Sequence, residues 1–395
     1  MNRLSETQRN NIIKIGLSDL VCFSHLRWNF VYQRPQHLLS RFAKIFRVFI
    51  IEEPFFEAGS DHLKISEGGD NVWVVVPHLR KNVADDTILR QKQLLSQLFK
   101  EREIKNYFFW YYTPMALPIS DHLKPELIVY DCMDELSSFK FAPPQLKELE
   151  SELFNKSDIV FTGGYSLFEA KKNRHKNIYP FPSSIDKAHF GRARTSNPEP
   201  QDQAGIPHPR LGYFGVIDER MDIGLVAKVA EKKPLWNFIL LGPVVKIDPD
   251  SLPRRRNIHY LGSKNYNELP GYLSGWDIAM IPFALNDSTR YISPTKTPEY
   301  LSAGKPVIST SIRDVVSPYG DHGLVHIADD PDEFIRVAEL ELRNTDKSRW
   351  LKSVDDFLSE NSWDETWSRM MQLISKSLEE RNNIQLTNLN KQQYV

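Results

Sequence analysis

The chain has 395 residues, which is too long for one ordinary hydrophobic core and predicts at least two domains. Its 50 basic and 51 acidic side chains leave a formal net charge of -1, so no strong global field exists for binding nucleic acid, and any anion site must be local. The two cysteines, Cys22 and Cys132, exclude a disulfide framework and lack the CxxC spacing of a metal knuckle.

No sign of export or of a membrane span is present in the sequence. The first 16 residues are polar, without the apolar stretch of a signal peptide, and no apolar run approaches the roughly 20 residues that cross a bilayer. We therefore expect a cytoplasmic protein that at most lies against the inner membrane. The basic run Lys171–Lys176 offers one such contact, worth about 1 kcal/mol per charge, although most short basic runs are solvated surface.

Short apolar runs alternate with helical segments over residues 1–190, which predicts an α/β domain with a parallel sheet. Segments 35–43 and 142–154 have the helical period. The expected strands are Asp19–Ser24, Val48–Glu52, Val72–Pro77, Tyr107–Tyr111, Leu127–Asp131 and Ile159–Thr162.

The same alternation starts again near Arg210 and predicts a second α/β domain over residues 210–360. Its expected strands are Leu211–Phe214, Asn237–Leu241, Ile258–Leu261, Ile278–Ile281, Val307–Ser309 and Leu324–Ile327. Between the two domains, residues 191–209 are rich in Pro, Gly and polar residues and predict a linker. A last helical stretch over 361–380 is followed by a polar tail, 381–395, for which we expect disorder. Two doubly wound domains predict a ligand cleft at the carboxyl ends of their strands.

The segment Ser293–Val307 predicts a short helix at a strand end. Thr297 suits the N-cap, Pro298 suits the first helical position, and Gly304 ends the helix. Free N–H groups at its start, together with Lys296, would bind a diphosphate, and Glu299 would accept hydrogen bonds from ribose hydroxyls. A capped helix with a solvated lysine and a capping glutamate explains the same residues equally well.

The loop Gly215–Asp222 follows the first strand of the second domain. It is not GxGxxG, so a nicotinamide cofactor loses support. Gly215 would let a ligand approach the backbone, and Arg220 would clamp a phosphate. Alternatively, Arg220 pairs with a neighbouring aspartate of the same loop.

The first domain offers candidates for the reacting groups and the acceptor. The loop Ser24–His37 is dense in polar and aromatic residues that suit sugar hydroxyls. His25 is the candidate for contact with the reacting groups, and a structural histidine is the alternative. The candidates for binding a sugar acceptor are Trp28, Tyr32 and Arg34.

A second catalytic candidate ends another strand of the first domain. Asp131 would act as a base or bind an acceptor hydroxyl, or would only cap the following helix. Because no DxD spacing and no histidine cluster accompany it, we expect no metal site.

Several stretches taken together are familiar. They are HLRWNFVYQRPQHLLSRFA, PSSIDKAHF, FILLGPV, NIHYLGSKNYNELPGYLSGWDIAMIPF and SPTKTPEYLSAGKPVIST, in this order. From Asp19 to Leu378 the chain resembles the family 4-type retaining glycosyltransferases of bacterial cell-surface polysaccharide synthesis. The resemblance implies the GT-B fold, in which two Rossmann-like domains face each other across a cleft and a helix starting near Asn361 crosses back onto the first.

The resemblance also assigns roles. It places Glu299 on the donor ribose and Lys296 with Arg220 on the diphosphate. The first Glu of the family's paired motif falls on Tyr291, which leaves the donor-sugar contact to Ser293 or Lys296. The histidine that often ends a first-domain strand falls near Asp131, so the catalytic partner is open.

We therefore expect transfer of a hexosyl group from a nucleoside diphosphate sugar to a hydroxyl of a glycan or lipid-linked glycan. The resemblance implies retention of configuration, no metal ion and no further cofactor. Two alternatives stay open. One is a sugar-nucleotide epimerase, and the other is a catalytically silent scaffold subunit of a polysaccharide assembly complex.

Overall fold

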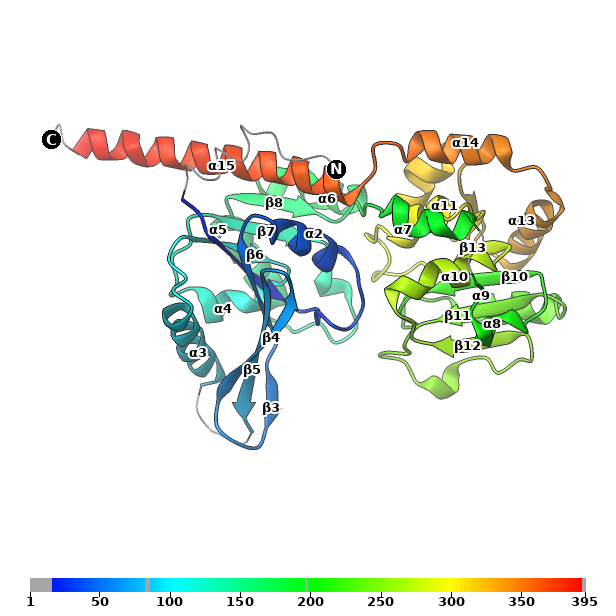
Figure 1. Cartoon of the computed structure of the whole chain (residues 1–395), viewed down its shortest axis with the longest axis horizontal. Coiled ribbons are helices and arrows are strands. Elements are labelled where there is room, and N and C mark those ends of the chain that lie inside the picture. The colour runs from blue at the N-terminus through cyan, green and yellow to red at the C-terminus, as the bar shows by residue number, and fades with distance from the viewer. Residues whose placement is uncertain (1–15, 82–85, 196–197, 393–395) are drawn as a thin grey trace.

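The structure is a computed structural model that describes residues 16–81, 86–195 and 198–392, with side chains up to Arg381. Two sheets lie apart in Figure 1, and the long helix α15 (Trp363–Gln392) runs along the first of them. The polar start of the chain, interpreted above as lacking a signal peptide, lies outside the described residues up to position 15.

The first sheet has nine strands in the order β3-β5-β2-β1-β6-β7-β8-β9, with β4 antiparallel to β5 and the other pairs parallel. The strands are β1 (Asp19–Ser24), β2 (Arg47–Glu52), β3 (Phe55–Glu57), β4 (His62–Gly69), β5 (Val72–Arg80), β6 (Tyr107–Tyr111), β7 (Ile128–Cys132), β8 (Ile159–Thr162) and β9 (Ile178–Pro180). The six predicted strands are present. The chain winds outward from β1 in both directions, so the strand order reverses between β1 and β6.

The second sheet has six parallel strands in the order β12-β11-β10-β13-β14-β15, which is the Rossmann order, and it reverses between β10 and β13. The strands are β10 (Arg210–Phe214), β11 (Asn237–Leu241), β12 (Ile258–Gly262), β13 (Ile278–Ile281), β14 (Val307–Ser309) and β15 (His326–Ile327). All six coincide with the predicted strands to within two residues. Four of them, β10, β11, β13 and β14, are short runs buried along their whole length, which is the pattern of a central parallel strand.

Helices cover both faces of each sheet. They are α2 (Arg34–Phe42), α3 (Thr87–Glu101), α4 (Leu117–Ser120), α5 (Leu146–Lys156), α6 (Tyr165–Lys171), α7 (Lys187–Gly191), α8 (Gln201–Ala204), α9 (Ile223–Lys232), α10 (Leu269–Ser274), α11 (Lys296–Ser302), α12 (Arg313–Val315), α13 (Pro331–Arg343), α14 (Ser348–Phe357) and α15. Alternation along β1 divides the first core in two: Leu20 packs on the side of α2 and α15, and Val21 packs on the side of α3 to α5.

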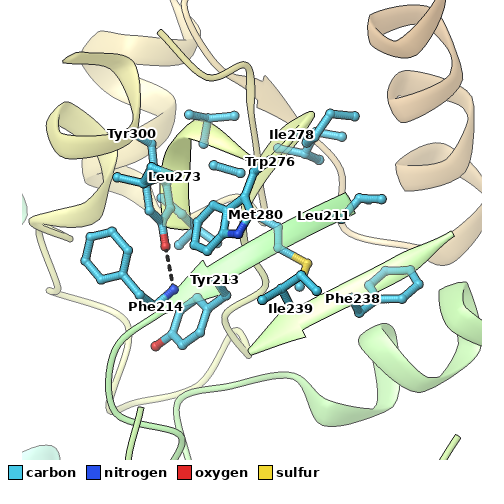
Figure 2. Close-up of a cluster of buried hydrophobic side chains, with 14 of the residues drawn as sticks. Leu211, Tyr213, Phe214, Phe238, Ile239, Leu273, Trp276, Ile278, Met280 and Tyr300 are labelled. Carbon is cyan, nitrogen blue, oxygen red and sulfur yellow. Dashed lines mark hydrogen bonds between the residues drawn. The ribbon is translucent and has the colours of Figure 1, made fainter. Parts of the chain in front are cut away.

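The second core fixes the start of α11 beside the end of β10 (Figure 2). The backbone N–H of Phe214 donates to the hydroxyl of Tyr300 at 3.0 Å, and both side chains are buried. Gly212 makes room for this arrangement, because a Cβ there would lie 1.9 Å from the ring of Trp276. The loop after β10 and the first turn of α11 therefore share one end of the sheet.

Two segments differ from expectation. Residues 191–209 bury Ala193, Gln203 and Ile206 against the second sheet, and Gln203 hydrogen-bonds the indole of Trp276, so this stretch contributes to a core that we did not expect of a linker. At the other end, α15 continues to Gln392, beyond the helix predicted over 361–380. Its first turns bury Trp363 and Met370 against the first sheet, as the resemblance implied.

Candidate functional site

Two glycines bring the loops after β10 and β11 together. Gly215 and Gly242 have φ values of 139° and 142°, a region that favours glycine. A Cβ on Gly242 would lie 1.9 Å from the carbonyl oxygen of Gly215, and a Cβ on Gly215 would lie 2.4 Å from Cε of Lys296. The predicted residues Gly215 and Lys296 are therefore in contact, and any side chain at position 215 displaces the lysine.

Lys296 is a cation held without a hydrogen bond or ion pair among the described residues. Its ammonium lies 5.4 Å from the ring centroid of Tyr213 and 5.8 Å from that of Phe283. Burial lowers the pKa of Lys296; the charge of Glu299 opposes this shift, and the charge of Arg220 adds to it. An anionic ligand would offset both the burial and the repulsion from Arg220, so the site is poised to accept one.

Glu299 lies one helical turn further along α11 and is only 7% exposed. Burial raises the pKa of its carboxyl, and the charge of Lys296 opposes that rise. Oε2 of Glu299 is buried without a hydrogen-bond partner, and so is the hydroxyl of Thr297. Unpartnered buried polar atoms are uncommon in folded proteins and are expected where a ligand completes the network.

The helix α11 starts earlier than predicted. It begins at Lys296 with Thr295 at the N-cap, so the predicted N-cap Thr297 and the predicted first residue Pro298 both lie inside the first turn. The proline is tolerated there because the first N–H groups of a helix have no intrahelical partner. This correction moves Lys296 from the loop onto the helix, and Glu299 remains in the first turn.

Arg220 makes the intraloop contact that the sequence left as an alternative. Its Nε donates to Oδ1 of Asp218 at 2.9 Å, and its Nη2 donates to Oδ2 at 2.6 Å. Burial disfavours the guanidinium charge, but Asp218 outweighs burial and raises the pKa of Arg220. The guanidinium also lies 5.8 Å from the ring centroid of Phe139, a residue of the first half. Arg220 is thus charged, oriented and placed where the two halves meet.

His25 follows β1 at the point where the order of the first sheet reverses. Burial lowers the pKa of His25 to about 4, a backbone contact with Tyr112 opposes this, and the charge of Lys246 lowers it further. Lys246 belongs to the second half, in the loop after β11, and its ammonium lies 5.3 Å from the ring centroid of Phe139. At neutral pH His25 is therefore an uncharged imidazole, and its Nδ1 is buried without a partner.

Asp134 is the site residue that sequence reasoning missed. Burial raises its pKa to about 6, the charges of Arg220 and Arg34 lower it, and the charge of Asp131 raises it. Its carboxylate has no hydrogen bond among the described residues. It lies two residues beyond the end of β7, on the loop that faces the second half. The available signal was its place after a buried strand, where ligands of such sheets bind.

Asp131 and Arg34 do not take the predicted open positions. They form a bidentate pair, with Nε to Oδ2 at 3.0 Å and Nη2 to Oδ1 at 2.8 Å, and the two side chains are 0% and 2% exposed. The remaining guanidinium nitrogen donates to the carbonyl of Phe181 at 2.7 Å. Burial raises the pKa of Asp131 and Arg34 opposes the rise. Both partners are used inside the first half, so neither a catalytic Asp131 nor an acceptor-binding Arg34 fits this geometry.

The two predicted stacking residues also have internal partners. Trp28 is buried, and its indole N–H donates to the carbonyl of Gly68 at 3.0 Å. Tyr32 is 42% exposed and its ring lies 4.6 Å from that of Tyr266 in the second half. The hydroxyl of Tyr266 is buried without a partner, and the charge of Glu299 contributes to its raised pKa. Tyr32 therefore lies on the Glu299 side of the junction, by which we mean the surface where the two halves meet. Trp28 does not reach this surface.

Ser293 lies at a contact between the halves. Its carbonyl accepts a hydrogen bond from the hydroxyl of Ser183 at 3.2 Å, and a Cβ on Gly164 would lie 2.7 Å from its side chain. Beside it, Oδ1 of Asp314 accepts from the backbone N–H of Ser166 at 2.9 Å. The position favours a role in joining the halves over the predicted contact with a donor sugar.

The basic run Lys171–Lys176 is largely neutralised. Lys171 is buried between Glu150, at 2.6 Å, and Glu135, at 2.7 Å, and Arg174 pairs with Glu150 at 2.6 Å. These pairs do not support the interpretation of the run as a membrane contact. Among the described residues, no helix is both long enough and apolar enough to cross a membrane.

One group in the described part of the chain brings three possible metal ligands within 4.8 Å of one another. It consists of Glu57, His62 and His78, on the ribbon of β3, β4 and β5. None of the predicted site residues belongs to it.

Residues 209–343 match the family model described as glycosyl transferases group 1. The matched segment runs from the start of β10 to the end of α13, so it contains Gly215, Arg220, Lys296 and Glu299. A protein of Bacillus subtilis (strain 168), provisionally named the teichuronic acid biosynthesis glycosyltransferase TuaH, is 24% identical over 244 residues. That alignment covers 55% of this chain and 61% of TuaH, so the chain matches less than two thirds of this relative's length.

Solved structures with the same fold cover nearly the whole chain. The structure described as trehalose-6-phosphate from E. coli bound with UDP-2-fluoro glucose has a TM-score of 0.66 at 12% identity and covers 91% of this chain and 99% of its own. Anabaena Alr3699/HepE in complex with UDP and glucose has a TM-score of 0.64 at 13% identity, with 90% and 99% covered. Sucrose-phosphate synthase from Thermosynechococcus elongatus has a TM-score of 0.57 at 12% identity, with 95% and 99% covered. The predicted GT-B fold of two Rossmann-like domains is confirmed.

Proposed function

We propose that the chain is a glycosyltransferase that moves a hexosyl group from a nucleoside diphosphate sugar to a hydroxyl of a glycan or glycolipid, in the synthesis of a bacterial surface polysaccharide. The observation that carries the proposal is the cluster of Lys296, Glu299 and Arg220 around Gly215, at the carboxyl end of β10. It lies inside the segment that matches the group 1 model, and the provisional name of the Bacillus relative supplies the biological setting.

In this proposal the second half binds the donor. Lys296 and Arg220 neutralise the diphosphate, and the contact with Asp218 holds the Arg220 fork in a fixed orientation. The free carboxylate oxygen of Glu299 accepts hydrogen bonds from the ribose hydroxyls. Binding a dianion raises the pKa of Lys296 and so keeps its ammonium charged next to Glu299.

The chemical step exchanges one bond at the anomeric carbon for another. The bond from that carbon to the diphosphate oxygen breaks, the bond to the acceptor oxygen forms, and the acceptor proton passes to an oxygen of the departing phosphate. Two fixed cations lower the energy of the developing charge on the leaving group, so we propose a reaction that needs no resident metal ion. Retention of configuration is part of the same proposal and follows the family resemblance.

The first half contributes His25 and Asp134. The uncharged His25 can accept a hydrogen bond from a hydroxyl of the transferred sugar through its unpartnered Nδ1. Asp134, with a pKa of about 6 and the charge of Arg220 acting on it, can orient the acceptor hydroxyl. Both groups come into use only when the two halves face each other across the bound sugar.

The test is a thermal-shift and saturation-transfer NMR screen against UDP, GDP, dTDP and ADP sugars without added metal. We expect one nucleotide class to raise the melting temperature, and the Lys296→Ala and Glu299→Gln variants to lose that response while remaining folded. Lys232→Ala on α9 is the matched control, since this lysine pairs with Asp332 on the outer surface. A folded protein that responds to no nucleotide would overturn the proposal and favour a silent scaffold subunit.

A further inference from the structure

A cavity of about 590 Å³ lies in the first half, beside the proposed reacting groups. Ser24, the last residue of β1, and Thr113, two residues after β6, line it, and His25 is the residue that follows Ser24. The cavity therefore opens beside the carboxyl ends of the strands where the sheet order reverses. The apolar side chains that shape it include Phe56, Ile88, Met115, Ile119 and Leu149.

The charges in the cavity are all acidic. Its described lining contains Glu52, Glu53 and Glu148 and no lysine, arginine or histidine. Glu52 is already used, because it accepts from the backbone N–H of Trp28 at 2.7 Å and pairs with Arg27 at 3.0 Å. A phosphate or carboxylate placed here would meet Glu53 and Glu148, while Arg27, outside the described lining, already pairs with Glu52. The lining therefore selects against the anionic part of any ligand.

The apolar lining continues onto the surface. Phe56 and Ile88 line the cavity and are 47% and 40% exposed, and their chain neighbours Phe55 and Leu89 are 49% and 52% exposed. Phe56 and Ile88 therefore extend the apolar wall of the cavity to its opening, whereas Phe55 and Leu89 lie outside the lining. A hydrocarbon chain longer than the cavity would stay on apolar surface as it leaves.

We propose that this cavity binds the hydrocarbon part of an uncharged amphipathic acceptor, whose hydroxyl-bearing head points toward His25. Three observations select this class of ligand: an apolar interior, acidic groups without a cation in the described lining, and a wall that includes Ser24, the residue before His25. The ligand's role as acceptor rests on the proposed function, whereas its binding in the cavity does not. Neutral glycolipids fit this description, and acceptors with a charged group next to the chain do not.

The probes are methyl, hexyl and octyl β-D-glucosides, used below the concentration at which they form micelles. Each methylene transferred from water into an apolar site strengthens binding about fourfold. We expect octyl glucoside to bind at least tenfold more tightly than the methyl compound, with saturation transfer strongest on the chain protons. Equal binding of the three probes, or saturation confined to the sugar protons, would show a saccharide subsite and overturn the proposal.

Neighbouring residues supply matched variants. Ile88→Glu places a charge in the cavity, and Leu89→Glu places the same charge on the next residue of the same helical turn, outside the cavity. Phe56→Glu and Phe55→Glu form a second such pair on β3. We expect Ile88→Glu and Phe56→Glu to weaken octyl glucoside binding tenfold or more and their partners to change it less than threefold. All four positions are exposed, so thermal melting should show folded proteins.

The two proposals fail separately. If the nucleotide screen is negative but octyl glucoside still binds and Ile88→Glu still abolishes that binding, the cavity stands and the transferase function falls. If a nucleotide sugar binds but the paired variants behave alike toward octyl glucoside, the donor site stands and the cavity proposal is overturned.

Discussion

The buried pair of Arg34 and Asp131 gives a prediction that separates a structural role from a catalytic one. The perturbation is Arg34→Met, which keeps the length of the side chain and removes the charge. In the native protein the carboxylate is 0% exposed and has two hydrogen bonds from the guanidinium. Without them, Asp131 can remain buried only by taking up a proton.

The magnitude follows from the protonation of Asp131. In the unfolded chain an aspartate titrates at about 3.9, and a tenfold change in a proton-binding constant corresponds to about 1.4 kcal/mol. If the variant's folded state keeps Asp131 protonated to pH 7, the loss of unfolding free energy relative to the native protein reaches at most about 4 kcal/mol at that pH, because burial already raises the pKa of Asp131 in the native protein. The pH dependence of this cost has the sign expected for a carboxyl group whose pKa is higher in the folded state than in the unfolded state. The cost is absent below the unfolded pKa and grows as the pH rises, so at pH 5 it falls to about 1.5 kcal/mol.

The assay is urea unfolding of Arg34→Met and of the native protein at pH 5 and pH 7, followed by tryptophan fluorescence and circular dichroism. The double variant Arg34→Met/Asp131→Leu should recover most of the loss, since a buried pair replaced by apolar groups is often neutral in stability. A loss that does not depend on pH would refute the reasoning, because it would mean that Asp131 is not desolvated in the variant. A loss of turnover in the double variant with full stability would restore the catalytic interpretation.

Three further predictions concern the junction. Because Asp134 titrates at about 6 and His25 at about 4, turnover should rise with pH through about 6, and Asp134→Asn should abolish that limb of the pH profile. Gly215→Ala should lose the nucleotide-induced thermal shift because its Cβ would lie 2.4 Å from Cε of Lys296; the control Gly69→Ala has the matching φ, of 140°, but meets nothing within 4 Å. Equal effects in the two glycine variants would mean that backbone strain alone is responsible. Gly164→Ala would place a Cβ 2.2 Å from a carboxylate oxygen of the other half, so small-angle scattering should show a larger radius of gyration. An unchanged radius would mean that the halves do not separate there.

The strands were predictable because most are short apolar runs buried on both faces of a parallel sheet. The strand β4 was not predicted, because its residues alternate between exposed and half-buried and two glycines lie at its end. It pairs only at the margin of the sheet. For residues 191–209 the prediction differed from the structure because polar residues there are buried. Their polar composition suggests a linker, but Gln203 satisfies its amide by bonding the carbonyl of Tyr272 and the indole of Trp276, so it can be fully buried.

The residues of the candidate site also differ in whether the sequence could predict them. Gly215, Lys296 and Glu299 could be predicted because local signals, a glycine after a strand and a helix start, mark their positions. Asp131 lies near the end of β7 and Asp134 lies two residues beyond it, and among the described residues the fold brings a hydrogen-bonding partner only to the carboxylate of Asp131. Arg34, which pairs with Asp131, lies 97 residues away in the sequence. No local pattern indicates that pairing, and therefore none indicates that the free carboxylate is Asp134.

The pKa of His25 cannot be predicted from the local sequence either, because it depends on residues of both halves. Its low pKa comes first from burial, which belongs to the first half, and then from the charge of Lys246, which belongs to the second. Separation of the halves would remove the charge of Lys246, and this change raises the pKa of the imidazole. His25 would then take up a proton at a higher pH than it does while the halves are together. The approach of the halves that lowers the pKa of His25 is thus the same approach that brings Arg220 toward Phe139 and Asp134.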